Sequence, residues 1–164
     1  MLRSQRLSLI PLREEHADSL FPILNDARLH TFIGGASLGL KELRDRYRSF
    51  QTRASPAGDE LWLNWIAQRL IDGTAVGYLQ ATVAGEHAIL AWVIGQRWQG
   101  NGYATEAAKA VIDWLFGYLR VAEVTAHIHP SHPASEGVAA RGGLTVTDDI
   151  VEGDRVWRLR RPPD

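Results

Sequence analysis

The sequence predicts an α+β fold in which helices flank a mixed central sheet. Segments of alternating apolar residues, typical of strands, occur in the first, middle and last parts of the chain. Other segments place apolar residues at helical spacing. The order is strand, two helices, three strands, helix, strand, helix and two strands, which is not the regular alternation of a purely parallel α/β sheet.

The first third of the chain contains one strand and two helices. Residues Gln5 to Leu12 alternate, and Pro11 places this strand near a sheet edge. Residues Glu14 to Asn25 show helical spacing. After a glycine-rich loop from Thr31 to Gly39, a charged helix with one apolar stripe extends from Lys41 to Arg53.

Three strands occupy the middle of the chain. Residues Glu60 to Leu70 alternate, the turn Asp72-Gly73-Thr74 predicts a hairpin, and Ala75 to Val83 forms the returning strand. A second turn at Gly85-Glu86-His87 follows. The run from Ala88 to Ile94 is then almost entirely apolar, as expected for a strand with both faces covered.

The last third adds two helices and three strands. They are the helices Tyr103 to Leu119 and Pro133 to Ala140, the strand Glu123 to His129, and a closing hairpin of Thr145 to Asp149 and Arg155 to Arg160. Since no linker, repeat or low-complexity tract interrupts the chain, we expect residues 1–164 to form one domain.

Bulk composition limits the classes of partner. The net charge of -1 gives no electrostatic reason to expect nucleic acid or an anionic membrane. The chain has no cysteine, which removes disulfides, thiolate metal sites and cysteine nucleophiles. We also find no signal-peptide pattern and no apolar run of membrane-spanning length, so a cytoplasmic location is the expectation.

The segment from Arg97 to Glu106 carries the strongest functional signal. It connects an apolar strand to the longest predicted helix through Gly100 and Gly102. Glycines allow the backbone to approach a ligand closely, and a helix N-terminus presents unpaired N–H groups and a positive dipole end. This segment therefore predicts a site for a phosphate-bearing ligand.

Two common phosphate motifs fit this loop poorly. The phosphate loop of nucleoside triphosphatases requires a lysine directly after its last glycine, and here the next lysine is Lys109, well inside the helix. The dinucleotide fingerprint requires a third glycine or alanine where Thr105 stands. It also belongs to repeated strand–helix–strand units that the remaining residues do not form.

A third pattern, Gln/Arg-x-x-Gly-x-Gly/Ala, matches as Arg97-x-x-Gly100-x-Gly102. In this pattern the chain resembles the GNAT superfamily of acyl-CoA-dependent N-acyltransferases. The stretches "RLSLIPLREEHADSL" and "HIHPSHPASEGVAARGGL" occur in the same order as in the ribosomal-protein (Rim-type) N-acetyltransferase branch. The resemblance covers nearly the whole chain and implies a GNAT fold, acetyl-CoA as co-substrate and an amine acceptor.

The resemblance also implies which residues bind coenzyme A. The strand before the loop would bind the pantetheine arm through backbone groups. The remaining candidates would bind the diphosphate through backbone N–H groups, the Thr105 hydroxyl and the charge of Arg97. The full set is Trp92, Val93, Ile94, Arg97, Gln99, Gly100, Asn101, Gly102, Tyr103, Ala104 and Thr105.

Acyl transfer to an amine also requires a group that protonates the leaving thiolate. The Rim-type branch carries Asn-x-x-Ser after the next strand, and this chain has His132-Pro133-Ala134-Ser135. Ser135 matches and is the candidate acid, although helix capping is an alternative role for it. His132 replaces the asparagine and is the corresponding cofactor contact.

The general base is harder to assign. Rim-type enzymes often carry a glutamate where this chain has Ile89. Glu86 in the preceding turn is the candidate that we retain, with His87 and Glu60 as alternatives. We expect no metal, because His127, His129 and His132 lack a carboxylate or cysteine at a recognisable ligand spacing.

The sequence therefore predicts an N-acetyltransferase that acts on a primary amine, either a protein N-terminus or a small molecule. The alternative is a non-catalytic CoA-binding or interaction module with the same fold. We expect acetyl-CoA and the amine acceptor as partners, and strands near the C-terminus leave a homodimer open.

Overall fold

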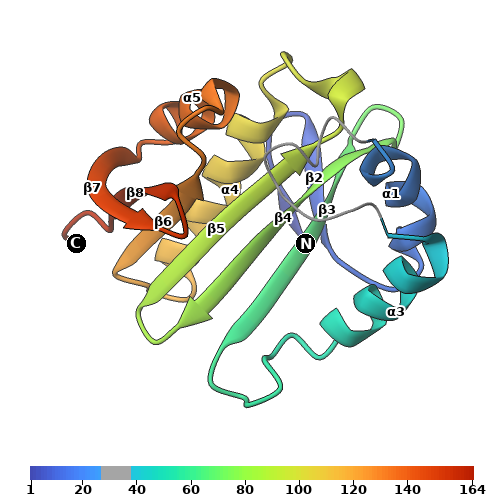
Figure 1. The fold of residues 1–164 in the computed structure, drawn as a ribbon, viewed down its shortest axis with the longest axis horizontal. Coiled ribbons are helices and arrows are strands. Elements are labelled where there is room, and N and C mark those ends of the chain that lie inside the picture. Colours follow the sequence, from blue (N-terminus) through green and yellow to red (C-terminus); the bar gives the residue numbers. More distant parts are fainter. Residues whose placement is uncertain (27–37) are drawn as a thin grey trace.

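The computed structural model describes residues 1–26 and 38–164. Its centre is one eight-stranded sheet with the strand order β1-β2-β3-β4-β5-β6-β8-β7 (Figure 1). The strands are β1 (Leu2–Arg3), β2 (Leu7–Pro11), β3 (Leu61–Arg69), β4 (Ala75–Ala84), β5 (His87–Ile94), β6 (Glu123–Ile128), β7 (Thr145–Val151) and β8 (Asp154–Arg160). The helices are α1 (His16–Leu24), α3 (Leu40–Phe50), the 3-10 turn η1 (Gln96–Trp98), α4 (Tyr103–Gly117) and α5 (Pro133–Arg141).

The helices cover the two faces of this sheet unequally. On one face, α4 buries Ala107, Val111 and Leu115 against inward-pointing residues of β3 to β6, and α5 extends this layer. On the other face, α1 and α3 enclose a smaller core around Leu20 and Ile66, over the N-terminal half of the sheet (Figure 1). The second face is therefore helix-covered over β2 to β4, with β5 to β8 lying beyond this core.

A split between β5 and β6 is the feature that positions the site. These strands form a parallel pair, whereas the other neighbouring strands are antiparallel. Their pairing runs only from His87↔Glu123 to Ile89↔Thr125, although the strands continue to Ile94 and Ile128. Figure 1 shows the two strands diverging toward the end where α5 begins. Backbone groups of both strands are left without a strand partner along this edge.

The observed elements confirm the predicted fold class and element order. The structure adds two short elements that periodicity cannot detect, β1 and η1. It ends α4 at Gly117 rather than Leu119. The expectation that both faces of β5 are covered is only partly correct, because Ala91 is exposed. The predicted loop from Thr31 to Gly39 lies outside the described residues except for its last two.

Candidate active site

A cavity of about 780 Å³ lies at the open end of the split. The end of β5 forms one wall, and the first turn of α5, with His132 and Ser135, forms the wall opposite. The glycine loop and the first turn of α4 close it. The split separates β5 from β6 at this point, so a long ligand can lie between the two strands.

The glycine loop exposes backbone donors to this cavity. Gly100 and Gly102 have φ values of +78° and +80°, a conformation that costs other residues about 1–2 kcal/mol. Gly102 is the N-cap of α4, and no side chain caps this terminus. Within residues 1–26 and 38–164, the N–H groups of Tyr103, Ala104 and Thr105 have no acceptor. Together with the helix dipole, these donors make an anion site.

Arg141 adds a positive charge to the same cavity, which the sequence analysis missed. It lies in the last turn of α5 and lines the cavity, and its Nε donates to the Thr105 Oγ1 at 3.3 Å. Gly137, one turn earlier on α5, makes room for this arrangement, since a Cβ there would lie 3.1 Å from the Arg141 Nη1. This contact joins α5 to α4, so no local pattern in the sequence marks it.

The backbone of β5 presents polar groups to the split at alternate residues. The N–H of Gly95 donates to the carbonyl of Val76 at 2.8 Å, which fixes the alternation of the β4–β5 ladder. Trp92 and Ile94 then direct their N–H and C=O groups away from β4, toward the split, whereas Val93 pairs with β4. The Ile94 carbonyl accepts a hydrogen bond from the Gln99 Nε2 at 3.0 Å.

Two predicted cofactor contacts have side chains that serve other contacts. Asn101 turns its Nδ2 onto the carbonyls of Trp98 and Gln99, at 3.0 and 3.2 Å. The Arg97 guanidinium lies 5.0 Å from the centroid of the Trp98 ring. Neither Arg97 nor Asn101 lines the cavity, whereas the other nine residues predicted for the strand and loop do.

The predicted residues of α5 are brought to the cavity. Both His132 and Ser135 line it. Burial, and secondarily the nearby His129, lower the pKa of His132, with Glu136 opposing them, so the neutral imidazole is favoured. No side chain caps the N-terminus of α5. The Ser135 hydroxyl is therefore not used as a cap and stays available to a ligand.

The predicted base Glu86 is not brought to this cavity, and the same holds for His87 and Glu60. Glu86 lies in the β4–β5 turn, where its carbonyl accepts the N–H groups of Ala122 and Glu123 at 2.7 and 3.2 Å. At about 3.3 Å per strand residue, this turn is roughly 25 Å from Ile94. The strand direction separates the two ends, so Glu86 does not line the cavity to which the predicted cofactor residues are brought.

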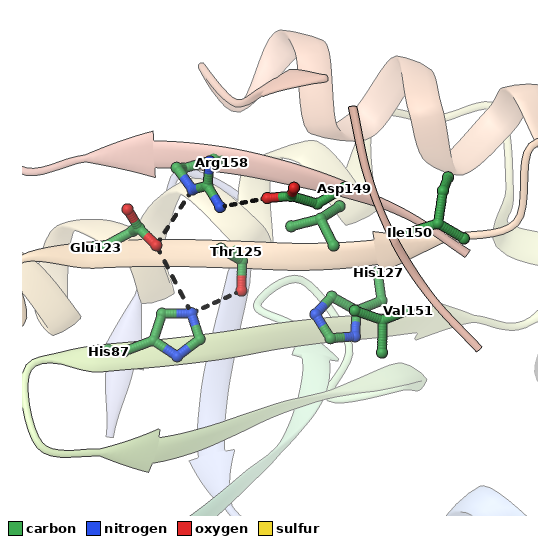
Figure 2. Close-up of a pocket in the computed structure, with 9 residues that line it drawn as sticks. His87, Glu123, Thr125, His127, Asp149, Ile150, Val151 and Arg158 are labelled. Carbon is green, nitrogen blue, oxygen red and sulfur yellow. Dashed lines mark hydrogen bonds and ion pairs between the residues drawn. The ribbon is translucent and has the colours of Figure 1, made fainter. Parts of the chain in front are cut away.

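A second cavity, of about 500 Å³, lies on the opposite face of the sheet beside β5, β6 and β8 (Figure 2). At one end His87 lies 2.9 Å from the Thr125 Oγ1, and Arg158 lies between Glu123 and Asp149 at 3.2 and 3.1 Å. Arg158 forms ion pairs with both carboxylates, although its buried Nε has no hydrogen-bond acceptor within the described residues. His127 also lines this cavity, two residues beyond the last residue of β6 that pairs with β5.

His127 is a titratable side chain near the split that the sequence analysis did not consider for proton transfer. Thr125 is the last residue of β6 that pairs with β5, so His127 follows at the mouth of the split, on the face opposite α4 and α5. Extending the register by two residues past the last pair makes Ala91 its counterpart on β5, across the split. Within the described residues, no hydrogen bond engages its imidazole. Its position depends on the parallel register of β6 with β5, which cannot be read from the sequence.

Two kinds of feature are absent from residues 1–26 and 38–164. No group of three or more histidine, cysteine or carboxylate side chains is arranged to hold a metal ion. No helix in these ranges has both the length and the apolar content needed to cross a bilayer.

Comparison with known proteins agrees with this geometry. A family model described as "Acetyltransferase (GNAT) domain" matches residues 6–145. The chain is 26% identical to the uncharacterized protein YkkB of Bacillus subtilis, over 91% of this chain and 87% of that protein. Because the family model spans most of the chain, the chain belongs to the GNAT acetyltransferase family.

Solved structures with the same fold include three bacterial proteins. A GNAT-family acetyltransferase from Bacillus anthracis has a TM-score of 0.80 at 15% identity, covering 98% of both chains. A candidate ribosomal-protein-serine acetyltransferase from Vibrio cholerae has a TM-score of 0.77 at 19% identity, covering 97% of this chain and 96% of that one. Spermidine N-acetyltransferase from Vibrio cholerae, in complex with CoA and spermine, has a TM-score of 0.77 at 15% identity, covering 94% and 95%. Identities this low establish the common fold.

Proposed function

We propose that this GNAT-family protein transfers the acetyl group of acetyl-CoA to a primary amine. The observation that carries the proposal is the split between β5 and β6. Unpaired backbone donors border it on the side of α4 and α5, and His127 stands at its mouth on the other face. A thioester and an amine that arrive from opposite faces of the sheet would meet there.

The residues of the first cavity fit coenzyme A chemically. Its diphosphate suits the unpaired N–H groups at the start of α4, with Arg141 supplying positive charge. Its pantetheine arm carries amide groups, which the outward-facing backbone of Trp92 and Ile94 can bind. The half-buried Trp92 ring provides an apolar wall for the same arm.

Acetyl-CoA supplies an acetyl group activated as a thioester. The amine nitrogen bonds to the carbonyl carbon and loses a proton, and the sulfur gains a proton as the carbon–sulfur bond breaks. The imidazole of His127 accepts the proton of the amine. The hydroxyl of Ser135 donates a proton to the sulfur and is reprotonated from solvent. His127 releases the proton of the amine to solvent, so no net proton is gained or lost. Backbone N–H groups along β5 stabilise the negative charge on the carbonyl oxygen.

The acceptor in this proposal is either a protein N-terminal amine or a small-molecule amine. The two Vibrio cholerae neighbours are a candidate ribosomal-protein-serine acetyltransferase and a spermidine N-acetyltransferase, so this fold serves both kinds of acceptor. Resemblance to the Rim-type branch supports the protein N-terminus. A test is release of free thiol from acetyl-CoA, measured with an acceptor panel of peptides with free N-termini, spermidine and an aminoglycoside.

Acceptor-dependent thiol release, with mass spectrometry showing one acetyl group added to the acceptor amine, is the expected result. A non-catalytic CoA-binding module is the second candidate, and the apolar Ile89, where the Rim-type branch often has glutamate, favours it. That candidate predicts tight acetyl-CoA binding without thiol release for any acceptor. The panel therefore separates the two functions.

A further inference from the structure

The glycine loop is held from outside the cavity by the segment just before β2. The Arg6 guanidinium donates through Nε to the Glu106 Oε2 at 2.8 Å and through Nη2 to the Asn101 carbonyl at 2.9 Å. The Arg6 backbone N–H donates to the Glu106 Oε1 at 2.6 Å. The guanidinium also lies 4.6 Å from the centroid of the Tyr103 ring. One side chain thus contacts the loop, its N-cap region and the first turn of α4.

The bond from Arg6 to the Asn101 carbonyl determines the direction of a cavity donor. A trans peptide group is planar, and its C=O and N–H point in opposite directions. The Asn101 carbonyl belongs to the same peptide group as the N–H of Gly102. When Arg6 holds this carbonyl outward, the Gly102 N–H is turned to the opposite side. Gly102 lines the cavity, and its N–H has no acceptor within the described residues.

The side chain of Asn101 acts in the same way one peptide group earlier. Its Nδ2 holds the carbonyl of Gln99, at 3.2 Å, on the outer side of the loop. The N–H of the same peptide group belongs to Gly100, which also lines the cavity. Glycines at both positions have broad conformational freedom, so without these bonds the two peptide planes could turn over at low cost.

Arg6 also neutralises a carboxylate that would oppose a phosphate. Glu106 lies in the first turn of α4, close to the unpaired donors. Burial acts to raise the pKa of Glu106, but hydrogen bonds from Ser4 and Arg6 and the charge of Arg6 outweigh it, so the pKa is lowered and the group stays ionised at neutral pH. Pairing with Arg6 holds this negative charge on the outer side of the loop.

We propose that Arg6 and Asn101 are positioning residues that aim the N–H groups of Gly102 and Gly100 into the cavity without touching the ligand. The inference rests on the proposed function only in assigning a diphosphate to that cavity. It predicts that an N-terminal side chain, far from the motif in sequence, determines acetyl-CoA affinity. The effect must be confined to ligands that carry the diphosphate.

The experiment compares Arg6→Met and Arg6→Lys with a matched control, Arg48→Met. Arg48 donates through Nε and Nη2 to Glu14 at 2.9 and 2.6 Å, so the control also removes a two-pronged arginine–carboxylate pair between elements, away from the cavity. Dissociation constants for acetyl-CoA are measured by calorimetry. Turnover with S-acetylpantetheine, which lacks the diphosphate, is measured on the same proteins, with thermal unfolding of each as a check on folding.

We expect Arg6→Met to raise the dissociation constant for acetyl-CoA by about tenfold or more, since it frees the Asn101 carbonyl and removes the positive charge that pairs with Glu106. Arg6→Lys keeps the charge but cannot fork between Glu106 and Asn101, so its loss should be intermediate. Asn101→Ala should weaken binding less than Arg6→Met. Arg48→Met should bind as the unaltered protein does, and S-acetylpantetheine turnover should change little in any variant.

Unchanged acetyl-CoA affinity in Arg6→Met, or an equal loss with S-acetylpantetheine, would overturn the inference. An equal loss of affinity in Arg48→Met would also overturn it, since destabilisation alone would then explain the effect. Failure of the unaltered protein to bind acetyl-CoA would overturn the cofactor assignment and the inference together. Acetyl-CoA binding by the unaltered protein therefore distinguishes failure of the cofactor assignment from failure of the inference about Arg6.

Discussion

The two ends of β5 carry opposite kinds of polar chemistry. At the start of the strand, His87, Glu123, Arg158 and Asp149 form a chain of side chains that pair with one another (Figure 2). At its end, backbone N–H groups around Gly102 and the start of α4 have no partner within the described residues. Ion-paired side chains mark the first end, and unpaired backbone N–H groups mark the second. We infer that the second property locates ligand binding.

This difference explains why sequence position favoured Glu86 as the candidate base, whereas the structure favours His127. Glu86 and His87 have suitable chemistry and lie near the motif in sequence, but an extended strand carries them to the far end of the sheet. His127, more than twenty residues after the motif, is placed at the split by the parallel pairing of β6 with β5. Chemical type is readable from sequence, whereas strand register is not.

We expect the largest effect on acetyl-CoA affinity from a substitution of Gly102, at the end of β5 where backbone N–H groups are unpaired. In Gly102→Val, a β-branched residue would have to adopt a φ near +80°, so the loop should rearrange and its donors should turn away. We expect acetyl-CoA affinity to fall by about a hundredfold or more, measured by calorimetry. Binding as tight as that of the unaltered protein would refute the assignment of the anion site.

Gly73→Val is a matched control for this change. Gly73 lies in the β3–β4 turn with a φ of +71°, and a Cβ there would meet nothing within 4 Å. Its backbone strain is therefore similar, but it is remote from the cavity. We expect it to lower the unfolding temperature without affecting acetyl-CoA affinity.

The second prediction concerns proton transfer at the mouth of the split. His127→Gln keeps a polar side chain of similar length but removes the group that accepts a proton. We expect kcat to fall by about a hundredfold, which is typical for loss of a general base, while acetyl-CoA affinity is retained. The reduction in kcat should become smaller as pH rises, because the acceptor amine then loses its proton without a base. A uniform loss across the pH profile would point instead to a packing role for His127.

The sequence predicts most of the fold because its signals are local. Alternation, helical stripes and the turn at Asp72-Gly73-Thr74 identify elements whose neighbours in sequence are also neighbours in the sheet. The glycine loop is likewise local, so nine residues that line the cavity, from this loop and the preceding strand together, could be predicted. Contacts that join segments distant in the sequence could not be predicted in this way. Arg6 meets Glu106, and Arg141 meets Thr105, only after the chain has folded.

Arg141 provides a prediction of intermediate size. Arg141→Met removes the cation that lines the cavity and frees the Thr105 hydroxyl. We expect the acetyl-CoA dissociation constant to rise about tenfold at low salt, because charge-assisted bonds to phosphate are among the stronger ones. The difference from the unaltered protein should narrow as salt is added. A dissociation constant that changes neither with Arg141→Met nor with salt would show that backbone donors alone bind the diphosphate.

Substitution of Ser135 should have a smaller effect, which is confined to kcat. Since the hydroxyl is not needed as a cap, Ser135→Ala should leave the unfolding temperature nearly unchanged and lower kcat by roughly tenfold. An acceptor amine of low basicity should show the larger loss if protonation of sulfur limits the rate. A lower unfolding temperature with normal kcat would identify a structural role instead.

The smallest effect is expected at the paired end, where the comparison can be tested from the other side. Arg158→Met removes a guanidinium that lies between Glu123 and Asp149 on a partly exposed surface. Such pairs contribute little in water, so we expect an unfolding shift of no more than about 2 °C and unchanged acetyl-CoA affinity. If Arg158→Met instead weakened acetyl-CoA binding as much as Arg141→Met does, pairing between side chains would not distinguish structural from ligand-binding polar groups. The two ends of β5 would then belong to one functional surface.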